Sequence, residues 1–217
     1  MKSTLIAGIV GLTTLASLVP TSAAAATTLT WNMGETSGST MRDTTGTYNG
    51  SISGDVTLGV SGVLGKAYEF DGGLVKIPSA SVLNPGSGRF SVSVYFKSTD
   101  KPDGDSYDLV RKGYSTTSGG DYKTEVLPGG NVHCEYRGSK RDVNVWGGFN
   151  VVNGSWNRIT CTKSSSGVTL KVNGSTQATS SRDPGTVSNS SALHVGAKNS
   201  SEDQVRGRLD SLTITKG

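Results

Sequence analysis

The sequence predicts an all-β protein built as a sandwich of two antiparallel sheets. Two stretches, residues 90–97 and 156–178, alternate apolar and polar side chains with the period of two that is typical of half-buried strands. Thirty glycines and a small share of aromatic residues fit many short strands joined by turns. Because no run shows a convincing helical period, we expect strands throughout the mature chain.

The stretch 156–178 is predicted to form two strands and the start of a third. The residues expected to share one face of each strand are Asn157, Ile159, Cys161 and Lys163, followed by Val168, Leu170 and Val172. Ser165-Ser166-Gly167 is predicted to form the first turn and Asn173-Gly174 the second, because Asn and Gly tolerate the positive φ of a tight hairpin.

Residues 90–97 give the clearest strand in the sequence. The side chains expected to face the core are Phe90, Val92, Val94 and Phe96. Further strands are predicted at 108–112, 122–127 and 132–137, with a Pro-Gly-Gly-Asn turn at 128–131. Strands at this spacing, separated by glycine-rich turns, favour a two-sheet sandwich.

The first 25 residues are predicted to be a secretory signal peptide. Lys2 supplies the positive start, residues 5–19 are apolar but short for a membrane span, and residues 23–26 offer small-residue cleavage sites. The alternative is a membrane anchor at the N-terminus. No later segment is long and apolar enough to cross a membrane, so we expect a secreted, extracellular protein.

The charge of the chain does not favour a nucleic-acid partner. The formal net charge is +4, and the basic residues are scattered along the sequence rather than gathered in blocks.

The order of several motifs resembles the laminin-G-like modules of the concanavalin A-like lectin/glucanase group, which are common in secreted bacterial proteins. The motif that carries the resemblance is a loop-closing Trp156 followed by an alternating strand, a short polar turn and a strand ending in Val172-Asn173-Gly174. The other matching pieces, in order, are 31–35, 43–46, 65–72, 90–97 and 207–214. The resemblance implies one jelly-roll domain over residues 26–217 with a concave face, and it implies that Trp31 and Trp156 belong to the core.

Cys134 and Cys161 are predicted to form a disulfide. They are the only cysteines of a chain expected to be exported, and each lies in phase with apolar neighbours. A metal site or a nucleophilic thiol would need further ligands or a nearby base. The bridge would close a loop of about 26 residues and contribute roughly 3–4 kcal/mol.

Two carboxylates share the phase of apolar side chains. Glu35 follows the apolar side of the first strand, and Asp210 lies on the inward side of the last one. A buried carboxylate needs a partner, a proton or a metal. Related modules often hold a structural calcium ion near the chain ends, so the resemblance implies calcium bound by Glu35 and Asp210 with help from Asp71 and the Gly72 carbonyl. The alternative is that both acids lie past the strand ends, in water.

An active site is not expected, although the larger group includes glycoside hydrolases and polysaccharide lyases. Retaining hydrolysis needs two nearby carboxylates, and the strand at 122–126 has only Glu125, with no acid two or four residues away. A lyase could recruit Lys123, Glu125, His133 and Arg137, but the characteristic lyase motifs are missing. His133 and His194 are expected at the surface.

A binding module is the preferred interpretation. Sugar sites use exposed aromatic faces and orienting polar groups, and Trp146 in a glycine-rich loop is the best candidate. The weaker candidates are Tyr95, Tyr107, Arg111 and Arg137. Trp146 could instead fold back over the sandwich edge. We expect a non-catalytic module that binds an extracellular glycan or polysaccharide. The alternative is a domain that binds a surface protein through the same scaffold.

Overall fold

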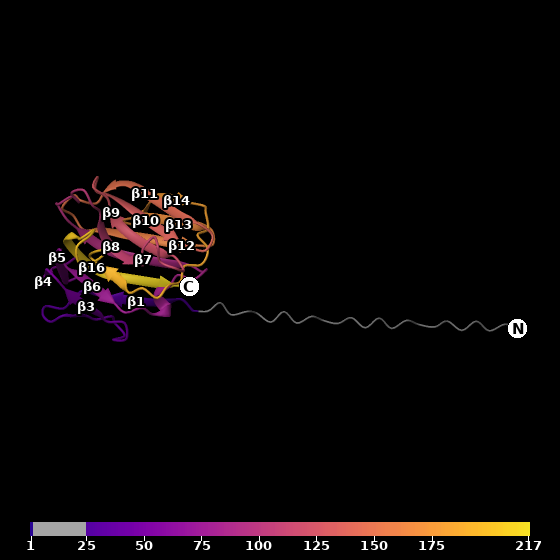
Figure 1. Ribbon diagram of the computed structural model, residues 1–217, viewed down its shortest axis with the longest axis horizontal. Helices are drawn as coiled ribbons and strands as arrows, with labels where there is room; N and C mark the ends of the chain where they lie inside the picture. Colours follow the sequence, from indigo (N-terminus) through magenta and orange to yellow (C-terminus); the bar gives the residue numbers. More distant parts are fainter. Residues whose placement is uncertain (2–24) are drawn as a thin grey trace.

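Two antiparallel sheets packed face to face form the molecule (Figure 1). The computed structural model describes Met1 and residues 25–217, so the predicted signal peptide lies outside the described residues apart from its two ends. Within the described part, the one helical element is a short 3-10 turn, η1 (Ser81–Leu83). The prediction of an all-β, two-sheet jelly-roll sandwich is therefore confirmed.

Each sheet has eight strands within residues 25–217. Sheet A runs in the order β14 (Ser175–Ser180), β13 (Gly167–Val172), β12 (Asn157–Ser164), β7 (Phe90–Lys97), β16 (Arg206–Lys216), β5 (Lys66–Asp71) and β4 (Val56–Ser61), with β1 (Thr27–Trp31) also paired to β16. Sheet B runs in the order β11 (Asp142–Asn150), β10 (Asn131–Arg137), β9 (Asp121–Val126), β8 (Tyr107–Lys112), β15 (Leu193–Val195), β6 (Leu74–Ile77), β3 (Gly50–Ser53) and β2 (Thr40–Met41).

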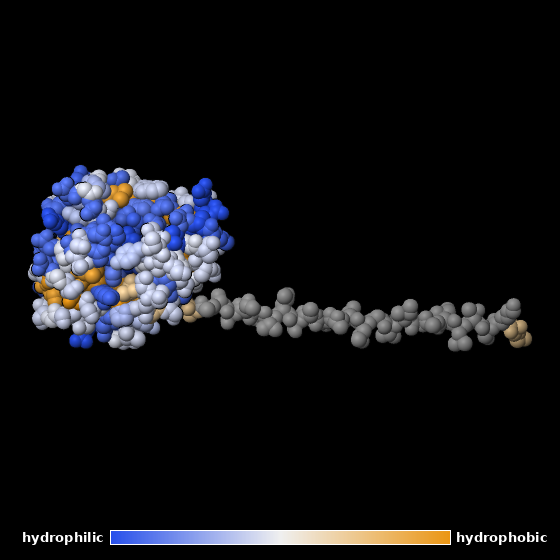
Figure 2. All heavy atoms as spheres, viewed as in Figure 1, coloured by the Kyte–Doolittle hydropathy of each residue, from blue (hydrophilic) through white to orange (hydrophobic). Residues whose placement is uncertain are grey.

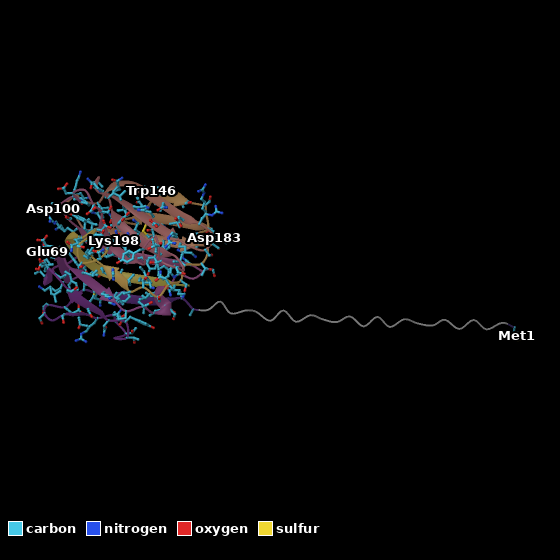
Figure 3. All side chains as sticks on the ribbon, viewed as in Figure 1. Met1, Glu69, Asp100, Trp146, Asp183 and Lys198 are labelled. Atoms are coloured by element: carbon cyan, nitrogen blue, oxygen red, sulfur yellow. A yellow bond between two sulfur atoms is a disulfide. The ribbon has the colours of Figure 1, made fainter. Side chains whose placement is uncertain are left out.

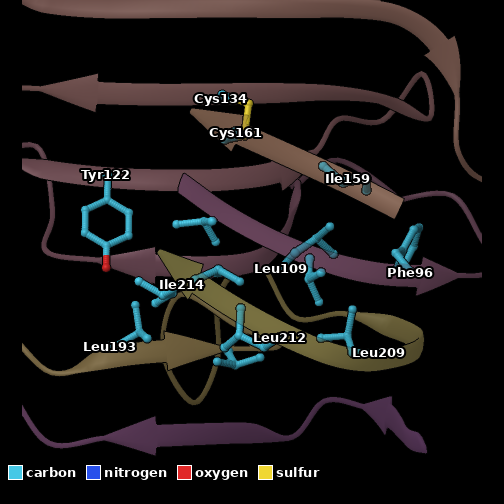
Figure 4. Close-up of a cluster of buried hydrophobic side chains, with 14 of the residues drawn as sticks. Phe96, Leu109, Tyr122, Cys134, Ile159, Cys161, Leu193, Leu209, Leu212 and Ile214 are labelled. Carbon is cyan, nitrogen blue, oxygen red and sulfur yellow. A yellow bond between two sulfur atoms is a disulfide. The ribbon is translucent and has the colours of Figure 1, made fainter. Parts of the chain in front are cut away.

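The core lies between the sheets, where alternate side chains of each strand meet (Figure 4). The four residues of β7 predicted to face inward, Phe90, Val92, Val94 and Phe96, are all buried. Burying an aliphatic or phenylalanine side chain of this kind contributes about 1.5–3 kcal/mol. The disulfide between Cys134 of β10 and Cys161 of β12 joins sheet B to sheet A across this core, with 6.0 Å between the Cα atoms, so the predicted bridge is confirmed.

The first and last strands of the sandwich pair with each other in sheet A. Trp31 of β1 lies opposite Leu212 of β16. The hairpin between β13 and β14 also follows the sequence, because Asn173 and Gly174 have φ angles of 52° and 83°, in the left-handed region that Asn and Gly tolerate best.

The two framework tryptophans differ in burial. Trp31 is fully buried and donates its indole N–H to the Tyr48 carbonyl oxygen at 2.8 Å. Trp156 is only half-buried, so the expectation that it belongs to the core is wrong. It precedes β12, which begins at Asn157, and therefore lies outside the regular part of the sandwich. No helix in the described part of the chain is long and apolar enough to span a membrane.

Candidate functional site

The outer face of sheet B carries polar side chains in rows that cross the strands. Strand alternation turns one set of β10 side chains into the core and the other, including His133, Glu135 and Arg137, onto this outer face. The strand register places Asp108, Glu125, His133 and Trp146 side by side in a first row. A second row contains Lys76, His194, Arg111, Lys123, Glu135 and Asn144, and a third contains Asp121, Arg137 and Asp142.

His133 is held firmly within the first row. Its Nδ1 lies 2.6 Å from Oε1 of Glu125, and its Nε2 lies 2.7 Å from Oδ1 of Asn144. Its ring stacks on the indole of Trp146, with 5.0 Å between the ring centroids and 7° between the planes. His133 is only 5% exposed, so the prediction that it lies at the surface is wrong. Because both ring nitrogens are engaged, the imidazole forms a fixed support beneath one face of Trp146.

The other face of Trp146 is open. The residue is 57% exposed, and among residues 25–217 the only other exposed large hydrophobic side chains are those of Leu64 and Phe149. On the side shown in Figure 2, hydrophilic and neutral residues cover most of the surface, with a few hydrophobic patches among them. Trp146 lies on β11, the edge strand of sheet B, next to β14, the edge strand of sheet A (Figures 1 and 3).

A groove of about 380 Å³ runs along these two edge strands. The polar side chains that line it beside Trp146 belong to Asp142, Asn144, Thr179, Ser180 and Arg182. An aromatic face flanked by hydroxyl, amide and charged groups can stack on the apolar face of a sugar ring while its hydroxyls form hydrogen bonds. The structure thus leaves Trp146 in the open, supported by His133, rather than folded back over the sandwich edge.

The carboxylates of the first row are enclosed by other side chains. Burial alone would raise the pKa of Glu125, but hydrogen bonds from His133 and Lys123 outweigh it and lower that pKa to about 2. Burial raises the pKa of Asp108 to about 7, although Arg111 acts in the opposite direction. Asp108 is fully buried and Glu125 is 4% exposed. Sequence reasoning missed that Asp108 lies opposite Glu125, because the two acids are on different strands and only the register reveals their proximity.

Arg137 and Asp121 form an ion pair that holds the loop between β8 and β9. Arg137 Nε donates to Oδ1 of Asp121 at 2.5 Å, and Nη2 donates to the carbonyl oxygens of Tyr114 and Thr117 at 2.7 and 3.0 Å. Arg111 pairs with the buried Asp108 in a similar way. The protein itself thus engages Nε and Nη2 of Arg137 and Nε of Arg111.

The five residues predicted to bind a ligand are not brought together. Tyr107 is 4% exposed and packs in the core, so it offers no aromatic face to a ligand. Tyr95 lies on the outer face of sheet A, where the guanidinium of Arg158 sits 5.9 Å from its ring centroid. Trp146, Arg111 and Arg137 all lie on the outer face of sheet B, but in three different rows. Alternation within one strand cannot show which sheet the strand joins.

The four residues predicted to bind calcium have separate surroundings. Oδ2 of the fully buried Asp210 accepts hydrogen bonds from the backbone N–H groups of Val63 and Leu64 at 2.7 and 3.3 Å, and Ser211 donates to Oδ1. Asp210 is therefore buried, as its phase predicts, but it is not an unpaired carboxylate.

Glu35 is half-buried and accepts hydrogen bonds from the Arg42 N–H and the Tyr68 hydroxyl. The side chain of Asp71 is largely exposed beside Arg206, and the Gly72 carbonyl accepts a bond from Gln204. No group of three or more potential metal-binding side chains occurs in the described residues. Calcium binding by these four residues stays a prediction.

Two antiparallel sheets in this arrangement place the protein among the lectin- and glucanase-like sandwiches. The chain belongs to the concanavalin A-like lectin/glucanases superfamily, because the laminin G family model of that description matches residues 70–217, more than half of the sequence. No curated protein matches the chain at the threshold of the search.

Several solved structures share the fold. One is domain 4 of AbnA, a GH43 extracellular arabinanase from Geobacillus stearothermophilus, whose structure was solved in complex with arabinotriose. It is 18% identical to this chain with a TM-score of 0.68, and the match covers 87% of this chain and 91% of that domain. The botulinum neurotoxin serotype D binding domain is 15% identical with a TM-score of 0.62, covering 86% and 46%. A Trypanosoma rangeli sialidase is 13% identical with a TM-score of 0.61, covering 86% and 30%. The match thus spans less than half of these last two chains, and identities this low show the fold alone.

Proposed function

We propose that this protein is a secreted, non-catalytic carbohydrate-binding module that stacks a sugar ring on the free face of Trp146. The observation that carries the proposal is the combination of an exposed indole, fixed from below by His133, with a groove of about 380 Å³ lined by polar side chains. Domain 4 of the arabinanase, which covers most of this chain, is described in complex with arabinotriose. Arabinan is therefore a reasonable first polysaccharide to test.

The chemistry of the first row supports binding rather than catalysis. A general acid needs a raised pKa and access to the substrate. Glu125 has a lowered pKa and two hydrogen-bonded partners, whereas Asp108, whose pKa is raised, is completely enclosed. Neither acid combines the two properties. We expect the purified protein to release no reducing ends or unsaturated products from polysaccharides, and a turnover abolished by Glu125→Gln would instead establish an enzyme.

The binding proposal can be tested by calorimetric titration of the full chain with arabinan and with a panel of other soluble neutral polysaccharides. Trp146→Ala should weaken binding at least tenfold, which corresponds to about 1.4 kcal/mol. Phe149→Ala is the matched control, because Phe149 is an exposed aromatic residue of the same strand that does not line the groove. Equal losses in the two variants, or no binding by the wild type, would contradict the proposal.

The alternative is an extracellular protein-interaction domain on the same scaffold. Trp146 and Phe149 together on an exposed edge strand favour it, because aromatic side chains are enriched at protein interfaces. Binding to a surface protein that requires both aromatics, without retention of any glycan, would establish this alternative.

A further inference from the structure

A second cavity, of about 170 Å³, opens on the outer face of sheet B four strands away from Trp146. The basic side chains that line it are Lys76 of β6, His194 of β15 and Arg111 of β8, which are direct neighbours in the second row. Tyr114 and Ser191 complete the polar part of its wall, and the lining includes no acidic residue. At roughly 30 Å³ per water molecule, the space accommodates one oxyanion with a few waters.

Each of the three basic side chains presents a nitrogen with no hydrogen-bond partner in the described part of the chain. Arg111 uses Nε for Asp108 and Nη1 for the Gly113 carbonyl at 3.4 Å, which leaves Nη2 without a partner. His194 uses Nδ1 for the Lys198 carbonyl at 2.7 Å, which leaves Nε2. Lys76 is exposed and forms no ion pair with the described residues. Three neighbouring strands therefore line one small cavity with side chains that each keep a nitrogen donor without a partner among the described residues.

This arrangement has an electrostatic cost. Basic side chains placed directly opposite one another on neighbouring strands destabilise a sheet. Asp108 compensates Arg111, and the nearby Lys198 is compensated by Glu202 and Asp203, at 3.4 and 3.9 Å. Lys76 has no such compensation in the described residues. An anion in the cavity would remove the repulsion and supply an acceptor to all three nitrogens.

We propose that this cavity, formed by Lys76, Arg111 and His194, is an anion-binding site for a carboxylate or sulfate group. It is distinct from the Trp146 groove and does not depend on the function proposed there. A uronic acid or sulfated sugar of an extracellular glycan and a free inorganic oxyanion share this chemistry. Four strand spacings of about 4.8 Å separate β15 from β11, so roughly 19 Å lies between the cavity and the Trp146 strand. One ligand would have to be an oligosaccharide to reach both sites.

His194 links anion binding to protonation. Burial, followed by the positive charges of Lys76 and Arg111, lowers the pKa of His194, although its hydrogen bond to the Lys198 carbonyl acts in the opposite direction. Because Nδ1 is committed to that carbonyl, protonation occurs at Nε2, the nitrogen without a partner. A bound anion favours the imidazolium and so raises the pKa of His194 again. The affinity for the anion should therefore rise as the pH falls from the raised pKa of His194 in the bound state toward its lowered pKa in the free protein.

Calorimetric titration of the full chain with sodium sulfate, at ionic strength matched with sodium chloride, tests the site. We expect saturable binding that tightens between about pH 7.5 and about pH 5.5. Lys76→Gln should weaken it at least tenfold, and His194→Gln should remove most of the pH dependence. Arg111 is left unchanged, because its loss would strand the buried Asp108 without a partner.

Lys171→Gln is the matched control, since Lys171 is an exposed lysine of β13 in the other sheet. Equal weakening by Lys76→Gln and Lys171→Gln would mean that only general charge attraction is measured and would overturn the site, as would a wild type that binds no sulfate.

Parallel titrations with an oligogalacturonate and a sulfated oligosaccharide distinguish an acidic glycan from a free inorganic anion as the ligand. Tighter binding of either one than of sulfate identifies an acidic glycan, whereas binding of sulfate alone identifies a free anion. Loss of neutral-glycan binding in Trp146→Ala is a separate readout, so either proposal can fail without the other.

Discussion

Removing the disulfide between the sheets should destabilise the protein by about 3.5 kcal/mol. Cys134 and Cys161 are 27 residues apart in the sequence, and closing a loop of that length removes about 12 cal/mol/K of entropy from the unfolded chain, or about 3.5 kcal/mol at 25 °C. For a domain of this size, that loss corresponds to a fall in melting temperature of roughly 7–14 °C. The perturbation is the pair Cys134→Ala and Cys161→Ala, because serine would bury two hydroxyl groups in an apolar core.

The assay is guanidinium unfolding followed by tryptophan fluorescence. Because the bridge acts mainly on the unfolded state, its loss should also raise the m value, as the unfolded chain becomes less compact. Val132→Ala is the matched control: Val132 is fully buried in the same strand as Cys134, and its truncation should lower the midpoint at an unchanged m value. A loss below about 1 kcal/mol, or an m value equal to that of the wild type, would refute the chain-constraint explanation.

Two further predictions concern buried charges. Burial lowers the pKa of Lys112 to about 8, whereas an unfolded lysine titrates near 10.4. Between these pH values the unfolded chain binds one more proton than the folded one, so the wild type should gain stability relative to Lys112→Met as the pH rises from about 8 to about 10. Parallel urea melts of the two proteins measure this, and equal slopes of stability against pH would disprove the lowered pKa. Asp210→Asn should lower the free energy of unfolding by about 1–3 kcal/mol in EDTA as well as in calcium, because it replaces the charged acceptor of two backbone N–H groups with a neutral amide oxygen. A loss seen only with calcium present, or a wild-type melting temperature that falls in EDTA, would establish the predicted calcium site.

The sequence alone predicted correctly those strands in which apolar and polar side chains alternate along the whole length. β7, β12 and β13 bury the side chains that their period of two predicts, and the Asn173-Gly174 turn follows from the conformations that these two residues tolerate. Alternation also placed Lys163 on the inner face, where it is indeed fully buried. The ammonium group of Lys163 can be buried there because it donates hydrogen bonds to the carbonyl oxygens of Gly86 and Gly88 at 3.1 and 3.2 Å. Those partners come from a distant loop, and no local pattern reveals them.

The candidate sites were less predictable because they depend on strand order. The sequence singled out Trp146 from its glycine-rich surroundings, but not its support, since His133 becomes its neighbour only through the pairing of β10 with β11. Lys76 and His194 are more than one hundred residues apart and meet because β15 inserts between β6 and β8. Tyr107 was misjudged for a related reason, because strand β8 buries all six of its residues.

The rows of sheet B also explain why ligands are expected away from the centre of the sheet. In the middle of the second row, Lys123 lies 2.8 Å from Glu125 and 3.7 Å from Glu135, so each charge there already has a partner. A ligand binding over the centre would have to compete with these ion pairs and bury their charges further, which is costly. Ion pairing is incomplete away from this centre: Trp146 lies on the edge strand of sheet B, and around His194 basic side chains meet without enough acids. The self-paired centre therefore restricts both proposed sites to positions where the protein has left an aromatic face or nitrogen donors unused.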